Sequence, residues 1–166
     1  MRSRAIKVTA TACLIVYLLL LTKLIVFKYP TGMISDILSM WSLDNVARQV
    51  QTANFIPFKT ISSSLFNPQL RIEVTTLIYN VAAFIPFGVF LPIINRNARK
   101  PIVVLVFGLM LSFAYELVQL VTLLGSADID DLILNAVGTA VGYGSFKLIR
   151  LTVNSEKLSR EATFLL

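Results

Sequence analysis

Four apolar stretches, each close to the length of a transmembrane helix, dominate this sequence. About 20 apolar residues are needed for a helix to cross about 30 Å of hydrocarbon. The chain of 166 residues is 56% hydrophobic and 14% charged, which is too apolar for a soluble domain and too long for a single anchor. The sequence therefore predicts an all-α membrane protein, a single domain over residues 1–166 with a bundle of four transmembrane helices. The predicted spans are Val8–Phe27, Val74–Ile94, Pro101–Leu124 and Leu132–Ile149.

The first stretch has the basic start of a signal peptide, because Arg2, Arg4 and Lys7 precede it. Its apolar core is longer than that of a signal peptide, and no cleavage site of small residues follows it. We therefore expect an uncleaved membrane helix.

Orientation follows from the basic residues in the short segments that flank the spans. If four spans alternate, these residues fall on one side: Arg2, Arg4, Lys7, Arg96, Arg99, Lys100, Lys147, Arg150, Lys157 and Arg160. The positive-inside pattern predicts that this side is the cytoplasm, with both termini there and residues 151–166 as a cytoplasmic tail.

The segment between the first two spans would then be a long extracytoplasmic loop. Apolar residues recur at helical spacing from Met33 to Trp41, which predicts a short interfacial helix. The aromatic turn Asn54–Phe58 follows it, and we expect this turn to meet the membrane surface.

Several classes of protein are excluded by composition. The net charge is +6, but the basic residues flank apolar segments, so we expect no nucleic acid partner. Cys13 is the only cysteine, so an intramolecular disulfide is impossible and a thiolate metal site is implausible. The sequence has no histidine, which removes catalysis based on imidazole. We expect neither a cofactor nor a bound metal.

Polar side chains interrupt the last three spans, where lipid makes them costly. Asn80, Glu116, Gln119 and Asn135 fall in the same half of the bilayer when the helices alternate, roughly 6–12 Å from the outer end of each helix. They could form a polar pocket that opens to the extracytoplasmic side. Alternatively, the side-chain amides of Asn80, Gln119 and Asn135 could form hydrogen bonds between helices instead of lining a pocket. Glu116 must be protonated, paired or hydrated at this depth.

Small and acidic residues mark the fourth span. Gly138 and Gly142 are four residues apart, so they permit a close approach of a second helix, and packing alone would explain them. Asp128, Asp130 and Asp131 resemble an acidic metal-binding loop, but other donors are missing. We expect Asp128 or Asp130 to cap the helix.

Arg48 lies between the first two spans, and we expect its side chain to be exposed. If the loop folds over Glu116, however, Arg48 would be the obvious partner of this carboxylate.

An ordered set of short motifs resembles the VanZ-like family of bacterial membrane proteins. The matching pieces are Arg48 with Asn54–Phe58, Asn80–Gly88, Glu116–Gln119, and Asp128–Gly138, within about residues 48–143. The resemblance implies a multi-span protein of the cell envelope, linked in some members to lowered susceptibility to teicoplanin, without an established enzymatic reaction. The candidate pocket residues are Arg48, Asn54, Pro57, Phe58, Asn80, Glu116, Gln119, Asp128, Asp131 and Asn135.

Three functions are compatible with this pattern. The preferred one is non-enzymatic binding of membrane lipids, a lipid-linked cell-wall precursor or an amphiphilic glycopeptide antibiotic. The second is an enzyme that acts on a lipid-linked or peptidoglycan precursor, with Glu116 and Asp131 as acid and base. The third is a small transporter, which would need polar groups in the inner half of the bundle, where the sequence has few.

Overall fold

The computed structural model describes residues 2–66 and 71–163, and this part of the chain is nearly all helical. The predicted all-α fold is confirmed. In the described residues, extended pairing is limited to one isolated bridge between Asn54 and Asp128. The elements are α1 (Arg2–Ile25), α2 (Thr31–Ser39), α3 (Leu43–Thr52), α4 (Lys59–Phe66), α5 (Arg71–Ile94), the 3-10 helix η1 (Asn97–Arg99), α6 (Pro101–Thr122) and α7 (Ile129–Thr163).

Four of these helices are long and apolar enough to cross a membrane, as the sequence predicted. The spans within them are Arg4–Ile25, Val74–Ile94, Pro101–Thr122 and Ile129–Val153. Helix α7 continues beyond the fourth span through Thr163, within the predicted tail of residues 151–166. Residues 164–166 and the side chains of Arg2, Lys157 and Arg160, which the orientation argument uses, lie outside the described part.

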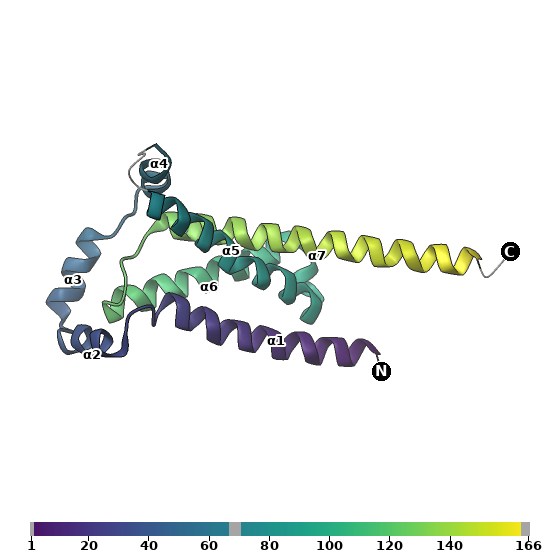
Figure 1. The fold of residues 1–166 in the computed structure, drawn as a ribbon, viewed down its shortest axis with the longest axis horizontal. Helices are drawn as coiled ribbons and strands as arrows, with labels where there is room; N and C mark the ends of the chain where they lie inside the picture. Colours follow the sequence, from purple (N-terminus) through teal and green to yellow (C-terminus); the bar gives the residue numbers. More distant parts are fainter. Residues whose placement is uncertain (1, 67–70, 164–166) are drawn as a thin grey trace.

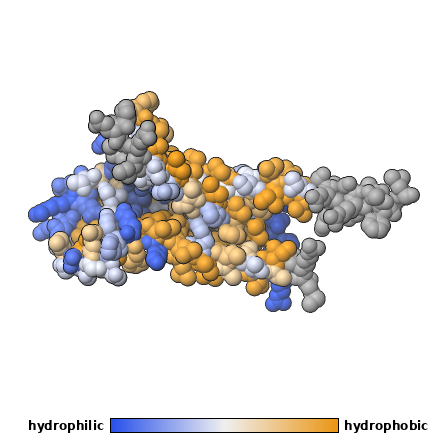
Figure 2. All heavy atoms as spheres, viewed as in Figure 1, coloured by the Kyte–Doolittle hydropathy of each residue, from blue (hydrophilic) through white to orange (hydrophobic). Residues whose placement is uncertain are grey.

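The long helices run side by side, and both ends of the chain lie at the same end of the molecule (Figure 1). Helices α2, α3 and α4 gather at the opposite end (Figure 1). Apolar residues cover the middle of the bundle, whereas hydrophilic residues gather around α3 (Figure 2). This is the arrangement of a protein that crosses a membrane an even number of times.

The most extensive helix contact joins α5 and α7, and glycine makes it possible. A Cβ on Gly138 would collide with the carbonyl oxygen of Val81, and a Cβ on Gly142 would collide with that of Ile85. From the α5 side, a Cβ on Gly88 would collide with the backbone of Thr139. The predicted close approach at Gly138 and Gly142 is therefore present, and α5 is the partner helix.

Two apolar clusters hold the bundle together at its two ends. Near α2, Leu21 of α1, Phe84 of α5 and Tyr115 of α6 are buried against one another. Near the termini, Val104 of α6 packs with Tyr143 of α7. The first cluster joins α1, α5 and α6, and the second joins α5, α6 and α7; the polar residues described below lie next to the first cluster.

The short helix predicted between Met33 and Trp41 is present as α2, but it ends at Ser39. Trp41 lies beyond its end, and the indole nitrogen donates a hydrogen bond of 2.8 Å to the carbonyl oxygen of Val121. This bond attaches the α2–α3 region to the last turn of α6.

Helix α3 begins at a capped residue: the hydroxyl of Ser42 accepts a hydrogen bond from the backbone N–H of Asn45. The side chain of Gln49 then donates to the carbonyl oxygen of Gly125. Because Gly125 lies in the α6–α7 turn, this contact attaches α3 to the end of the bundle.

Candidate functional site

A polar cavity of about 300 Å³ lies where α1, α5, α6 and α7 meet, at the end of the bundle that carries α2, α3 and α4. Each of the four helices contributes side chains from the part nearest that end. The lining residues are Leu24, Ile25, Lys28, Thr76, Tyr79, Asn80, Tyr115, Glu116, Gln119, Asp131 and Asn135. Tyr79 is 67% exposed, and Lys28 is exposed, so the cavity reaches the surface of the protein.

Five of the ten residues proposed from the sequence line this cavity. They come from three different helices, α5, α6 and α7, so only the fold brings them together: Asn80, Glu116, Gln119, Asp131 and Asn135. Three of them are nearly inaccessible to solvent, with exposed fractions of 7% for Glu116, 6% for Gln119 and 5% for Asn135.

Both carboxylates of the cavity accept hydrogen bonds from the protein. One oxygen of Glu116 accepts from the backbone N–H of Asp128 at 3.0 Å. One oxygen of Asp131 accepts from the side-chain amide of Asn80. Each carboxylate therefore keeps a second oxygen that accepts no hydrogen bond from the described residues.

The amides of the cavity also connect helices, as the alternative interpretation expected. Gln119 on α6 donates to the carbonyl oxygen of Ile25 at 3.1 Å, and Asn135 on α7 donates to the hydroxyl of Ser112 at 2.8 Å. Lining a cavity and joining helices are thus compatible for the same side chain.

Asn54 and Asp128 lock the loop before α4 to the α6–α7 turn. The side chain of Asn54 donates to a carboxylate oxygen of Asp128 at 2.8 Å. The backbones pair as well, because Asn54 donates to the carbonyl of Ala127 at 3.0 Å and accepts from Ile129 at 2.9 Å. Both residues thus have structural partners, and the polar cavity is not lined by either.

The acidic turn caps two helices. Helix α7 begins at Ile129, and the carboxylate of Asp128 accepts from the backbone N–H of Asp130 at 2.8 Å, so the predicted cap is confirmed at Asp128. Asp130 is fully buried and instead accepts from the backbone N–H groups of Phe58, Thr60 and Ile61 at 2.5–3.1 Å.

These three donors lie at the start of α4, where N–H groups lack partners within the helix. Asp130 therefore caps α4 from about 70 positions away in the sequence. Among the described residues, no group of three acidic, histidine or cysteine side chains is arranged to hold a metal ion.

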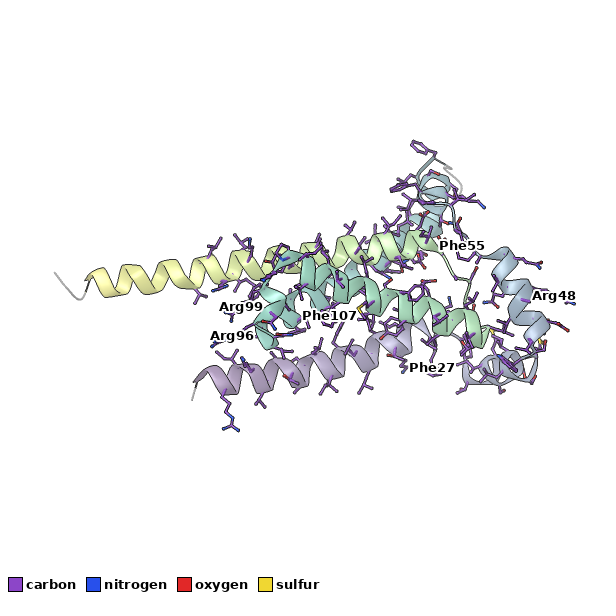
Figure 3. All side chains as sticks on the ribbon, turned by 180° about the vertical axis from the view of Figure 1, so that it is seen from behind. Phe27, Arg48, Phe55, Arg96, Arg99 and Phe107 are labelled. Carbon is purple, nitrogen blue, oxygen red and sulfur yellow. The ribbon has the colours of Figure 1, made fainter. Side chains whose placement is uncertain are left out.

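Three further candidates lie away from the polar cavity. Arg48 is exposed on α3 and lines a separate cavity of about 410 Å³ with Gln49 and Leu123 (Figure 3). The loop does not fold Arg48 over Glu116, so the conditional pairing of the two is not formed. Pro57 and Phe58 lie in the turn before α4, where Phe58 is 60% exposed with a positive φ of 65°.

A second, apolar cavity of about 250 Å³ lies on another side of Glu116. Apart from Glu116 and Asp128, its walls are apolar: Phe55, Phe113, Leu117, Leu120, Ala127, Ile129 and Leu132. Glu116 is thus the residue that the polar and apolar cavities share.

The sequence analysis missed Lys28, Thr76, Tyr79 and Tyr115 as cavity residues. A signal for Lys28 existed, since it directly follows the first predicted span and so lies at the outer end of the bundle, on the same side as the polar groups. It lines the same cavity as Glu116 and Asp131. Tyr115 carried no such signal, because a tyrosine in an apolar helix is usually a packing residue.

Fold and cavity together define a multi-pass membrane protein with a polar site among its helices. A profile of the VanZ/LLP1 family matches residues 14–150, and the chain belongs to this family. One relative is Protein VanZ of Enterococcus faecium, which is 28% identical over 158 residues, covering 95% of this chain and 86% of that protein. No solved structure matches the chain.

Proposed function

We propose that this protein binds an amphiphilic molecule of the bacterial cell envelope at the polar cavity and thereby lowers susceptibility to antibiotics of the teicoplanin type. The ligand is an envelope lipid, a lipid-linked cell-wall precursor or an amphiphilic glycopeptide. The cavity opens on the extracytoplasmic side of the cytoplasmic membrane, and both termini lie in the cytoplasm.

The observation that carries this proposal is the gathering of three amide and two carboxylate side chains around one cavity inside an apolar bundle. Polar and ionisable groups at membrane depth are costly and usually mark a function. Hydrogen bonds between helices alone would not require a cavity of about 300 Å³ that reaches the surface.

The two cavities beside Glu116 favour an amphiphilic ligand. A polar headgroup suits the cavity with Lys28 and Asp131, and an apolar chain suits the cavity with Phe55 and Leu132. Membership of the VanZ/LLP1 family and the likeness to Protein VanZ support the link to glycopeptide susceptibility.

The orientation rests on the basic residues at the end that carries the termini. Arg96 and Arg99 lie there, in the connection between α5 and α6 (Figure 3). By the positive-inside rule this end faces the cytoplasm, so the polar cavity faces outward.

An enzymatic function is the second candidate, since Glu116 and Asp131 line the same cavity and could act as acid and base. Both carboxylates, however, accept a hydrogen bond from the protein, from Asp128 and Asn80 respectively. These hydrogen bonds would hold both carboxylates in place for the recognition of a ligand without any reaction.

Mass spectrometry of the lipids that co-purify with the intact protein tests the proposal. We expect one class of amphiphile to be enriched over the bulk membrane, and the enrichment to fall in Glu116→Gln and Asp131→Asn. Asp36→Asn is the matched control, because Asp36 is exposed on α2 and does not line the cavity. Equal lipid profiles for all four proteins would refute binding at this site.

Susceptibility to teicoplanin, measured in cells that express the same variants at equal membrane levels, tests the link to resistance. We expect protection by the natural protein and by Asp36→Asn. Full protection by Glu116→Ala would contradict a role for the cavity.

A further inference from the structure

The hydrogen bonds inside the polar cavity indicate which part of an amphiphile enters it. The side-chain nitrogens of Asn80, Gln119 and Asn135 all donate to protein acceptors: Asp131, the carbonyl of Ile25 and the hydroxyl of Ser112. Their amide oxygens accept no hydrogen bond from the described residues. Each amide is therefore turned so that its acceptor remains for a ligand.

The two carboxylates add to this excess of acceptors. Glu116 and Asp131 each use one oxygen within the protein and keep the other. The residues that carry these three amide oxygens and two carboxylate oxygens, from α5, α6 and α7, all line one cavity. A ligand that satisfies them must present several hydrogen-bond donors.

A phosphate group fits this lining poorly. Phosphate oxygens are acceptors, and negative charge beside Glu116 and Asp131 is repelled. Lys28 is the one cation among the described residues that line the cavity, and it is exposed. The same lysine disfavours a cationic amine, because its positive charge lines the same cavity.

A neutral group with several hydroxyls remains. We propose that the polar cavity binds a glycosyl group, the sugar part of a glycolipid or of a glycopeptide, and not a lipid phosphate. The inference rests on the proposed binding function and deepens it by naming the chemical class of the headgroup. Both sources carry hydroxyl donors, so the experiment must separate them.

Native mass spectrometry of the full-length protein in detergent, titrated with two lipids of identical acyl chains, tests the inference. One lipid is a neutral glucosyl diacylglycerol, and the other is phosphatidylglycerol. We expect the glucosyl lipid to bind at least about tenfold more tightly, because its hydroxyls can donate hydrogen bonds to the two carboxylates. Glu116→Gln and Asp131→Asn should each remove about tenfold of this affinity, and Asp36→Asn should leave it unchanged.

A second arm identifies the source of the sugar. Teicoplanin and its deglycosylated form are added as competitors of the bound glucosyl lipid. Displacement by teicoplanin alone supports a glycopeptide as ligand. Displacement by neither supports a glycolipid, and equal displacement by both forms overturns the assignment of the sugar.

Failure of the inference can be distinguished from failure of the proposed function. Tighter binding of phosphatidylglycerol, lost in Lys28→Gln, would overturn the glycosyl inference while the cavity remained a lipid site. If binding of neither lipid changed in the Glu116, Asp131 or Lys28 variants, both proposals would fail.

Discussion

Replacement of one glycine in α7 tests how closely α5 and α7 must approach. In Gly142→Ala, the added Cβ would lie well inside van der Waals contact with the carbonyl oxygen of Ile85, and 3.0 Å from the Cα of Gly88. Both neighbours belong to helical backbone, so no flexible side chain can move aside. The helices must separate, and this loosens the contact of Gly138 with Val81 one turn away.

A matched control lies on the same helix. Gly144 is exposed, and a Cβ added there would meet no atom within 4 Å. Both substitutions gain the same helix propensity, about 1 kcal/mol from glycine to alanine. The difference between the two variants therefore isolates the cost of overpacking, which is about 1–3 kcal/mol.

Thermal unfolding of the purified variants in detergent measures this difference. At about 2–4 °C per kcal/mol for a chain of this size, we expect Gly142→Ala to melt roughly 2–12 °C below Gly144→Ala. Membrane levels should fall for Gly142→Leu and stay normal for Gly144→Leu. Equal melting temperatures for the two alanine variants would refute the close contact of α5 with α7.

Three further predictions concern orientation, capping and mechanism. Reporter fusions at the C-terminus should report the cytoplasm, and a periplasmic signal there would reverse the proposed orientation. Asp130→Ala should speed hydrogen exchange of the backbone amides at the start of α4 by about tenfold or more, since three N–H groups lose their acceptor. Exchange as slow as in Asp36→Ala would contradict the cap. Glu116→Gln and Asp131→Asn should keep measurable protection against a lipoglycopeptide if the site only binds. If both variants lost roughly 10²-fold or more of this protection while lipid binding stayed intact, acid–base catalysis would be favoured.

Much of the fold could be predicted from the residue patterns of short segments of the sequence. The four spans could be predicted because apolar length and charged flanks are local properties of a chain in a bilayer. The cap at Asp128 and the close approach at Gly138 and Gly142 were also predictable, since both depend on residues within a few positions of one another. The sequence placed Asn80, Glu116 and Asn135 in the same half of the bilayer, and the fold arranges them around one cavity.

Contacts between distant segments were decided by the tertiary structure. Asp130 looked equivalent to Asp128 in the sequence, yet it caps α4, because the loop before α4 lies against the start of α7. Lys28 joins the polar cavity and Arg48 does not, although both belong to the same predicted loop. The membrane depth of a residue can be predicted from its position within a span. The direction in which a loop folds depends instead on the hydrogen bonds that it forms with distant segments of the bundle.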